Sequence, residues 1–109
     1  HMGGARAVLA QPIAEAKAAL SDAATALHEG VADGRFVAQA APLFRLRIRL
    51  AEIVQQSLQL ELLACGGRAY HRDQPSGFAR RWREAAFIPI VTPSLTQLRT
   101  ALTLEAAAA

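Results

Sequence analysis

The sequence predicts an all-α fold, and three features of its composition and patterning lead to this prediction. Apolar residues make up 52% of the 109 residues, and alanine and leucine supply most of them. Aromatic residues account for only 6% and β-branched residues are sparse, a mixture that favours helices over strands. Apolar side chains recur at spacings of three and four along successive segments, as on one face of a helix. We therefore expect a four-helix bundle, mostly antiparallel with up-and-down topology.

The first predicted helix spans about residues 11–29. Pro12 suits its first turn, because the N–H that proline lacks would have no helical partner there. We expect Gly30 to cap the C-terminal end in a left-handed conformation, followed by a turn at Asp33–Gly34. The apolar stripe of this helix consists of Leu9, Ile13, Ala16, Leu20, Ala23 and Leu27.

The second predicted helix is the longest and should be the central one. It starts near Phe36 or just before Pro42 and runs to Ala64. The strand-like alternation over residues 45–50 is accidental on this interpretation, since the helical period continues on both sides of it. The main stripe comprises Leu43, Leu46, Leu50, Ile53, Ser57 and Leu60, and it is broadened by Phe44, Ile48, Val54, Leu58 and Leu62.

Two shorter helices are expected after a glycine pair. Gly66–Gly67 ends the second helix, and residues 68–76 form a polar loop. A third helix covers about residues 77–87, and the last one opens with Thr92 as N-cap and Pro93 at its first position. The apolar stripes of these helices are Phe78, Trp82, Ala85 and Ala86, and then Leu95, Leu98 and Leu102.

The length indicates one domain, which we place at residues 5–109. Residues 1–4, with the sequence His-Met-Gly-Gly, resemble a remnant of cloning and are set aside. The formal net charge is +3, which by itself does not indicate a nucleic-acid partner. Charged residues interrupt every apolar stretch, so we expect no membrane span. No secretory signal pattern is visible, and a reducing cytoplasmic location is therefore expected.

The polar residues suggest neither a catalytic residue nor a metal site. Cys65 falls at a helix C-terminus, where the helix dipole does not favour a thiolate, so we expect an inert buried thiol. His28 and His71 lie far apart, and neither has a second ligand at helical spacing. A single cysteine also excludes a disulfide within the chain and a multi-cysteine zinc site.

Arginines form a second candidate site, a phosphate-binding surface made of Arg45, Arg47 and Arg49 together with Arg80, Arg81 and Arg83. Residues two apart on a helix point in different directions, so each triplet is spread around its helix. Solvated faces and ion pairs between helices are the favoured interpretation, with nucleic-acid binding as an alternative. The low aromatic content argues against a platform for stacking single strands.

The segment from Leu58 to Leu102 carries a more specific pattern. It consists of a long helix, Gly66-Gly67 followed by Tyr70, a proline-containing loop, and a helix with Arg83-Glu84-Ala85. This order resembles the C-terminal helical domain of acyl-CoA dehydrogenases and their flavin-dependent relatives. The resemblance implies a helical bundle that forms the interface of a homo-oligomer, either a dimer or a tetramer. It also implies that backbone groups of Gly66 and Gly67 contact FAD.

Further features of the family bear on this sequence residue by residue. Tyr70 and Arg83 match positions that look structural in the family, and Glu84 stands where an aspartate is usual. Many members carry a catalytic glutamate in a Tyr-Glu-Gly-Thr segment, and here residues 91–94 read Val-Thr-Pro-Ser. Thr92 has no group that could remove a proton at neutral pH. Leu63 replaces a glutamine that often precedes the glycine pair.

The resemblance therefore implies the C-terminal bundle of an acyl-CoA dehydrogenase-like, FAD-dependent oxidoreductase. Its substrate would be of the acyl-CoA type, handled by upstream domains that this sequence lacks. This chain would contribute subunit assembly and one side of the flavin site, and it would be inactive on its own. The alternative is a free-standing helical protein–protein interaction module without flavin chemistry.

Overall fold

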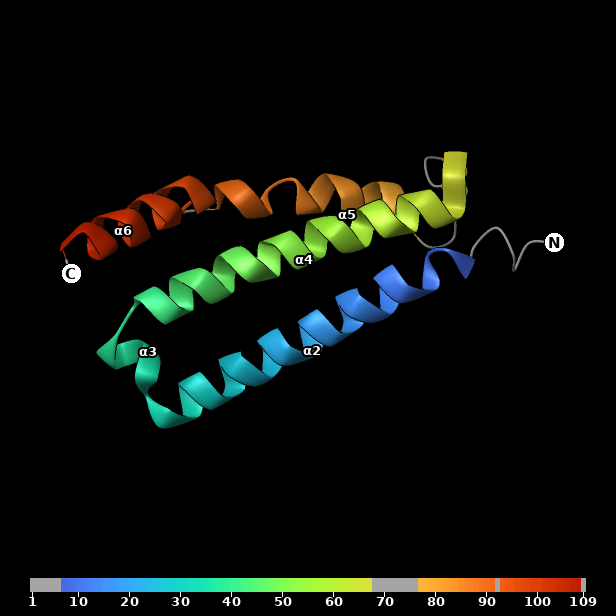
Figure 1. Cartoon of the computed structure of the whole chain (residues 1–109). Coiled ribbons are helices and arrows are strands. Elements are labelled where there is room, and N and C mark those ends of the chain that lie inside the picture. The colour runs from blue at the N-terminus through green and yellow to red at the C-terminus, as the bar shows by residue number, and fades with distance from the viewer. Residues whose placement is uncertain (1–6, 68–76, 92, 109) are drawn as a thin grey trace.

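The computed structural model describes residues 7–67, 77–91 and 93–108, and no strand occurs in these ranges. The all-α prediction is confirmed. Figure 1 shows the helices in chain order: α2 (Ala10–Asp33), α3 (Arg35–Ala38), α4 (Ala41–Cys65), α5 (Phe78–Ala85), the 3-10 helix η2 (Ile88–Ile90) and α6 (Leu95–Ala108).

Helix α2 confirms the first predicted helix, but its expected C-terminal cap is wrong. The helix continues through Gly30, which is buried, and ends at Asp33. Gly34 is the cap, in the left-handed conformation with φ 76° and ψ 10°. Gly30 serves a different purpose, because a Cβ atom there would overlap the ring of Phe36. The missing side chain thus lets an aromatic ring lie against the helix backbone.

The second predicted helix had two possible starts, and the structure selects the later one. Helix α4 begins at Ala41, with Pro42 in its first turn. The residues from Arg35 to Ala38 form the separate short helix α3, because Gln39 has an extended backbone with φ −140° and ψ 124°. At the other end, α4 stops at Cys65, and Gly66 follows with φ 62°. The predicted stop at the glycine pair is confirmed.

Helix α5 lies within the predicted third helix, whereas the predicted start of the last helix is wrong. Helix α6 begins at Leu95, so Pro93 precedes the helix instead of occupying its first position. Ser94 and Gln97 form a capping box: the Gln97 N–H donates to the Ser94 hydroxyl at 3.2 Å, and the Ser94 N–H donates to Gln97 Oε1 at 2.6 Å. Thr92, the predicted cap, lies outside the described residues.

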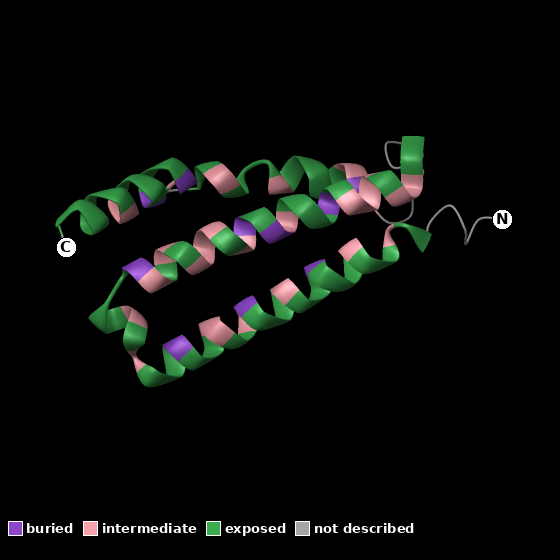
Figure 2. Ribbon diagram, viewed as in Figure 1, coloured by how far each residue is buried: buried purple, intermediate pink, exposed green. Residues whose placement is uncertain are grey.

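Helix α4 is central, as predicted, and packs against α2, α5 and α6. Figure 1 shows α6 and α5 following one another along α4, with α2 along a different side. Figure 2 shows buried positions spread along α4 between these neighbours. Helix α6 packs on the first half of α4 through Ala51, Leu95 and Leu98. Helix α5 packs on the second half, where Phe78 and Leu58 are buried together.

The contact between α2 and α4 has a different composition. The buried residues of α2 are Ala16, Ala23 and Gly30, spaced seven apart along one line of the helix. Of the larger apolar residues of the same helix, Ile13, Leu20 and Val31 are exposed and Leu27 is half-buried. The predicted stripe is therefore buried only at its smallest members.

Candidate functional site

The glycine pair lies at the exposed end of α4. An added Cβ atom would meet nothing within 4 Å at Gly66 or at Gly67, so no other part of the described chain encloses them. The Gly66 N–H donates to the carbonyl oxygen of Leu62 and is therefore not free for an anionic ligand. The described residues do not form a flavin cradle by themselves. Arg68, Ala69 and Tyr70 lie outside the described residues, and the flavin contact of the glycine pair stays a prediction.

The residues considered for metal or thiol chemistry remain apart. Cys65 is a free, half-buried thiol that packs against the cluster of Leu58 and Phe78. His28 is exposed on α2, and His71 lies outside the described residues. In the described ranges, no group of three or more histidine, cysteine, aspartate or glutamate side chains could hold a metal ion.

Several arginines connect α4 to its neighbours. Arg81 on α5 forms an ion pair with Glu61 on α4. Arg99 on α6 lies 3.9 Å from Glu52, also on α4. Arg47 on α4 donates a hydrogen bond to the carbonyl oxygen of Val91 at 2.6 Å. Of the six arginines in the candidate phosphate-binding surface, Arg81 thus has an ion pair between helices, and Arg47 contacts a backbone carbonyl instead of a carboxylate.

Within α5, one arginine has a local partner. The Arg80 guanidinium donates to the Glu84 carboxylate at 2.8 Å, one helical turn away. The pKa of Arg80 is raised, mainly by this hydrogen bond and then by the charge of Glu84. Both side chains are largely exposed, so the pair contributes little to stability.

A feature that the sequence did not predict is an apolar groove between α2 and α5, with α4 as its floor. It consists of two adjacent hollows of about 360 and 460 Å³ that share the lining residues Leu20, Ser57 and Glu61. We call this feature the α2–α5 groove. Its walls and floor are formed by Ile13, Ala16, Lys17 and Leu20 of α2, by Ile53, Val54, Ser57, Leu58, Leu60, Glu61 and Ala64 of α4, and by Arg81, Glu84, Ala85 and Ile88 from α5 and η2.

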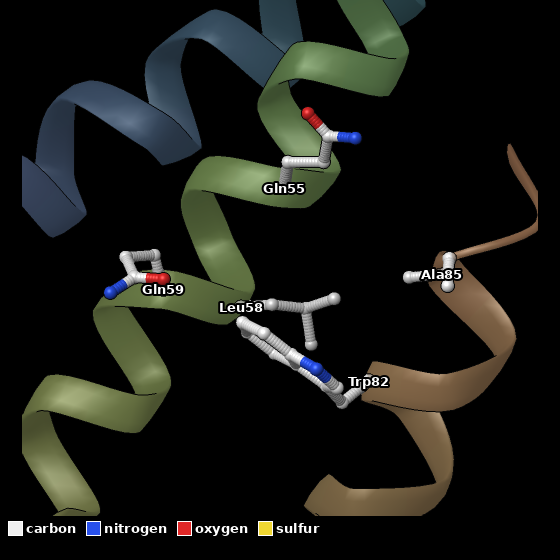
Figure 3. Close-up of a pocket in the computed structure, with 6 residues that line it drawn as sticks. Gln55, Leu58, Gln59, Trp82 and Ala85 are labelled. Atoms are coloured by element: carbon white, nitrogen blue, oxygen red, sulfur yellow. The ribbon is translucent and has the colours of Figure 1, made fainter. Parts of the chain in front are cut away.

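A smaller hollow of about 280 Å³ lies beside the same α4–α5 contact. Figure 3 shows the Trp82 indole of α5 next to Leu58, with Gln55 and Gln59 projecting from α4. The Trp82 ring also packs against Phe78, with ring centroids 5.6 Å apart. Trp82 thus extends the core cluster towards the surface.

Two further observations bear on function. Among the described helices, none combines the length and the apolar character that crossing a membrane requires. Comparison with known proteins gives no match, whether with protein-family models, curated proteins or solved structures. The resemblance to the acyl-CoA dehydrogenase family therefore remains a prediction from the motif order.

Proposed function

We propose that this chain is a helical protein–protein interaction module that binds a further helical segment in the α2–α5 groove. The observation that carries this proposal is the exposure of large apolar side chains along the groove. Leu20 is 50% exposed, and Ile13 and Ile88 are also exposed. Side chains of this kind normally face the interior of a helical domain, and a continuous apolar surface typically marks a binding site.

The shape of the molecule supports the same proposal. Its radius of gyration is 17.1 Å, whereas a compact domain of this length has about 13 Å. Helix α2, helix α4 and the line of α5 and α6 form three rods, with α4 in the middle (Figure 1). A helix lying in the groove would complete the antiparallel four-helix bundle that the sequence predicts.

The test uses a fluorescein-labelled amphipathic peptide of about 20 residues, which is ~30 Å long as a helix. Its binding to the purified chain is followed by fluorescence anisotropy. We expect saturable binding to the wild type and at least about tenfold weaker binding to Leu20→Glu, because burying a leucine contributes roughly 1.5–3 kcal/mol. The control is Leu104→Glu, an exposed leucine of α6 outside the groove. Equal binding to all three proteins would contradict the proposal.

A second candidate is the flavoprotein assembly domain that the resemblance implies. It is supported by the position of Gly66 at an exposed helix end and of Arg83, Glu84 and Ala85 on or at the end of α5. The test is the intact mass and visible absorbance of the natural protein recovered from its source with an antibody to this domain. A much heavier, yellow protein is expected. A colourless protein of about this length would contradict this candidate.

A further inference from the structure

We infer that the occupant of the α2–α5 groove is a second copy of this chain, paired through α2 about a two-fold axis near Leu20. The inference rests on the proposed function and adds the identity of the partner. The two chains together would place α2 and α4 of each copy in one four-helix arrangement.

The first argument is the area that the chain leaves exposed. Its accessible surface is 7686 Å². A compact monomer of 11.6 kDa exposes about 5,800 Å², so the excess is roughly 1,800 Å². A stable protein–protein interface buries about 800 Å² on each partner. The excess is thus larger than the area that each partner buries in a stable interface.

The second argument is the charge distribution in the groove. The chain as a whole has a formal charge of +3, so two copies repel each other at long range. The groove itself contains two cations, Lys17 and Arg81, and two carboxylates, Glu61 and Glu84. A two-fold interface places a surface against itself, so a balanced patch can pair with its own copy whereas a patch of one sign cannot.

The third argument is the position of Leu20. Leu20, Ser57 and Glu61 are common to both hollows and therefore lie at the middle of the groove. In a two-fold interface, the residue at the centre meets its own copy. Leu20 and Ile13 are seven residues apart and form an apolar ridge on α2. This ridge runs beside the line of small buried residues formed by Ala16, Ala23 and Gly30. In the proposed dimer, this ridge of one copy would lie in the groove of the other.

The decisive experiment is disulfide trapping in a Cys65→Ala background, so that each variant has one thiol. Leu20→Cys is compared with Leu104→Cys, which places an exposed thiol outside the groove. Under mild oxidation we expect Leu20→Cys to form a covalent dimer at least about tenfold faster than Leu104→Cys, since proximity raises the effective concentration of the partner thiol. Equal rates would overturn the inference.

Light scattering supplies a readout that does not depend on cysteines. The wild type should have twice the 11.6 kDa mass of one chain, and Leu20→Glu should have the mass of one chain. Circular dichroism checks that Leu20→Glu stays helical, and Leu20→Ala replaces it if it does not. A dimer that survives every Leu20 substitution would overturn the inference.

The outcomes also separate this inference from the proposed function. In a dimer the peptide must displace the second copy, so a dimeric wild type that the peptide converts to single chains supports both. A monomeric wild type that binds the amphipathic peptide in the groove would overturn the second copy as partner and keep the interaction module. A monomeric wild type that binds no peptide would overturn both.

Discussion

The two sides of α4 show how differently one helix can be used. On the side facing α5 and α6, large residues are buried, with Phe78 at 0% exposure and Leu98 nearly so. On the side facing α2, the buried partners are Ala16, Ala23 and Gly30. The first side has the composition of a domain core. The second brings two helix backbones close together at alanine and glycine residues.

The difference indicates where the stability of the single chain comes from. Because hydrophobic stabilisation follows the apolar area buried, α5 and α6 should be held on α4 more firmly than α2 is. Helix α2 keeps Ile13 and Leu20 at the edge of its contact, where a partner can cover them. On this account, one side of α4 supports the fold, and the proposed interface with a second copy lies on the other side.

The largest effect should come from Phe78→Ala, which tests the side with large residues. Removing this fully buried ring should lower the free energy of unfolding by about 3–5 kcal/mol, because it leaves a cavity between α5 and α4. Urea unfolding followed by circular dichroism measures the change. The control is Val37→Ala, at a residue 94% exposed, for which we expect a change within about 0.5 kcal/mol. A Phe78→Ala effect as small as that of the control would contradict the assignment of α5 to the hydrophobic core.

A smaller effect is expected from Gly30→Ala, which tests the side with small residues. The new methyl group would overlap the Phe36 ring and force it away, lowering the free energy of unfolding by about 1–3 kcal/mol. In a Phe36→Ala background the sign should reverse, since alanine then stabilises the helix by about 1 kcal/mol over glycine. Urea unfolding of the four proteins gives both values. The same effect in both backgrounds would contradict the role assigned to Phe36.

Ser94→Ala tests the capping box at the start of α6, the helix that packs on α4 through Leu95 and Leu98. Loss of the hydroxyl acceptor leaves the Gln97 N–H without its cap, and we expect about 1 kcal/mol lower stability. Thr96→Ala is the matched control on the same first turn, where the side chain is exposed. Thermal unfolding of both variants measures the difference. Equal melting temperatures would show that the cap does not stabilise α6.

The smallest effect concerns the turn between α2 and α3. The Arg35 side chain and backbone N–H donate to the Asp33 carboxylate, which lowers the pKa of Asp33 below its ordinary value. The ion pair therefore adds stability above the pKa of the unfolded chain and loses it as the pH falls through the lowered folded pKa.

The measurement is thermal unfolding of the wild type and Asp33→Asn at pH 7 and at about pH 2.5. The wild type should be slightly more stable than Asp33→Asn at pH 7, and the difference should shrink towards the acidic pH as Asp33 takes up its proton. A stability difference that stays constant with pH would contradict this account.

The sequence predicted helices well because their apolar spacing reflects burial on α4. It failed at Gly30 because a glycine near a helix end signals a cap and a close approach equally, and only the placement of Phe36 distinguishes them. It also placed the start of the last helix at Thr92 and Pro93, whereas the reciprocal hydrogen bonds of Ser94 and Gln97 precede α6 in the structure.

The α2–α5 groove could not be predicted from periodicity, for a different reason. The stripe of α2 contains Ile13, Ala16 and Leu20 as one set, and spacing alone does not tell which members face another helix. All three line the groove, but Ala16 is buried against α4 whereas Ile13 and Leu20 are exposed. Only the angle at which α2 lies on α4 decides this division.

The central claim is that α2 depends on a second copy whereas α5 and α6 are held within the chain. Amide hydrogen exchange at a series of protein concentrations tests it most directly. We predict that protection of α2 rises with concentration as its groove side becomes covered, while protection of Leu95 to Leu102 in α6 stays constant. Protection of α2 that is independent of concentration would contradict the account.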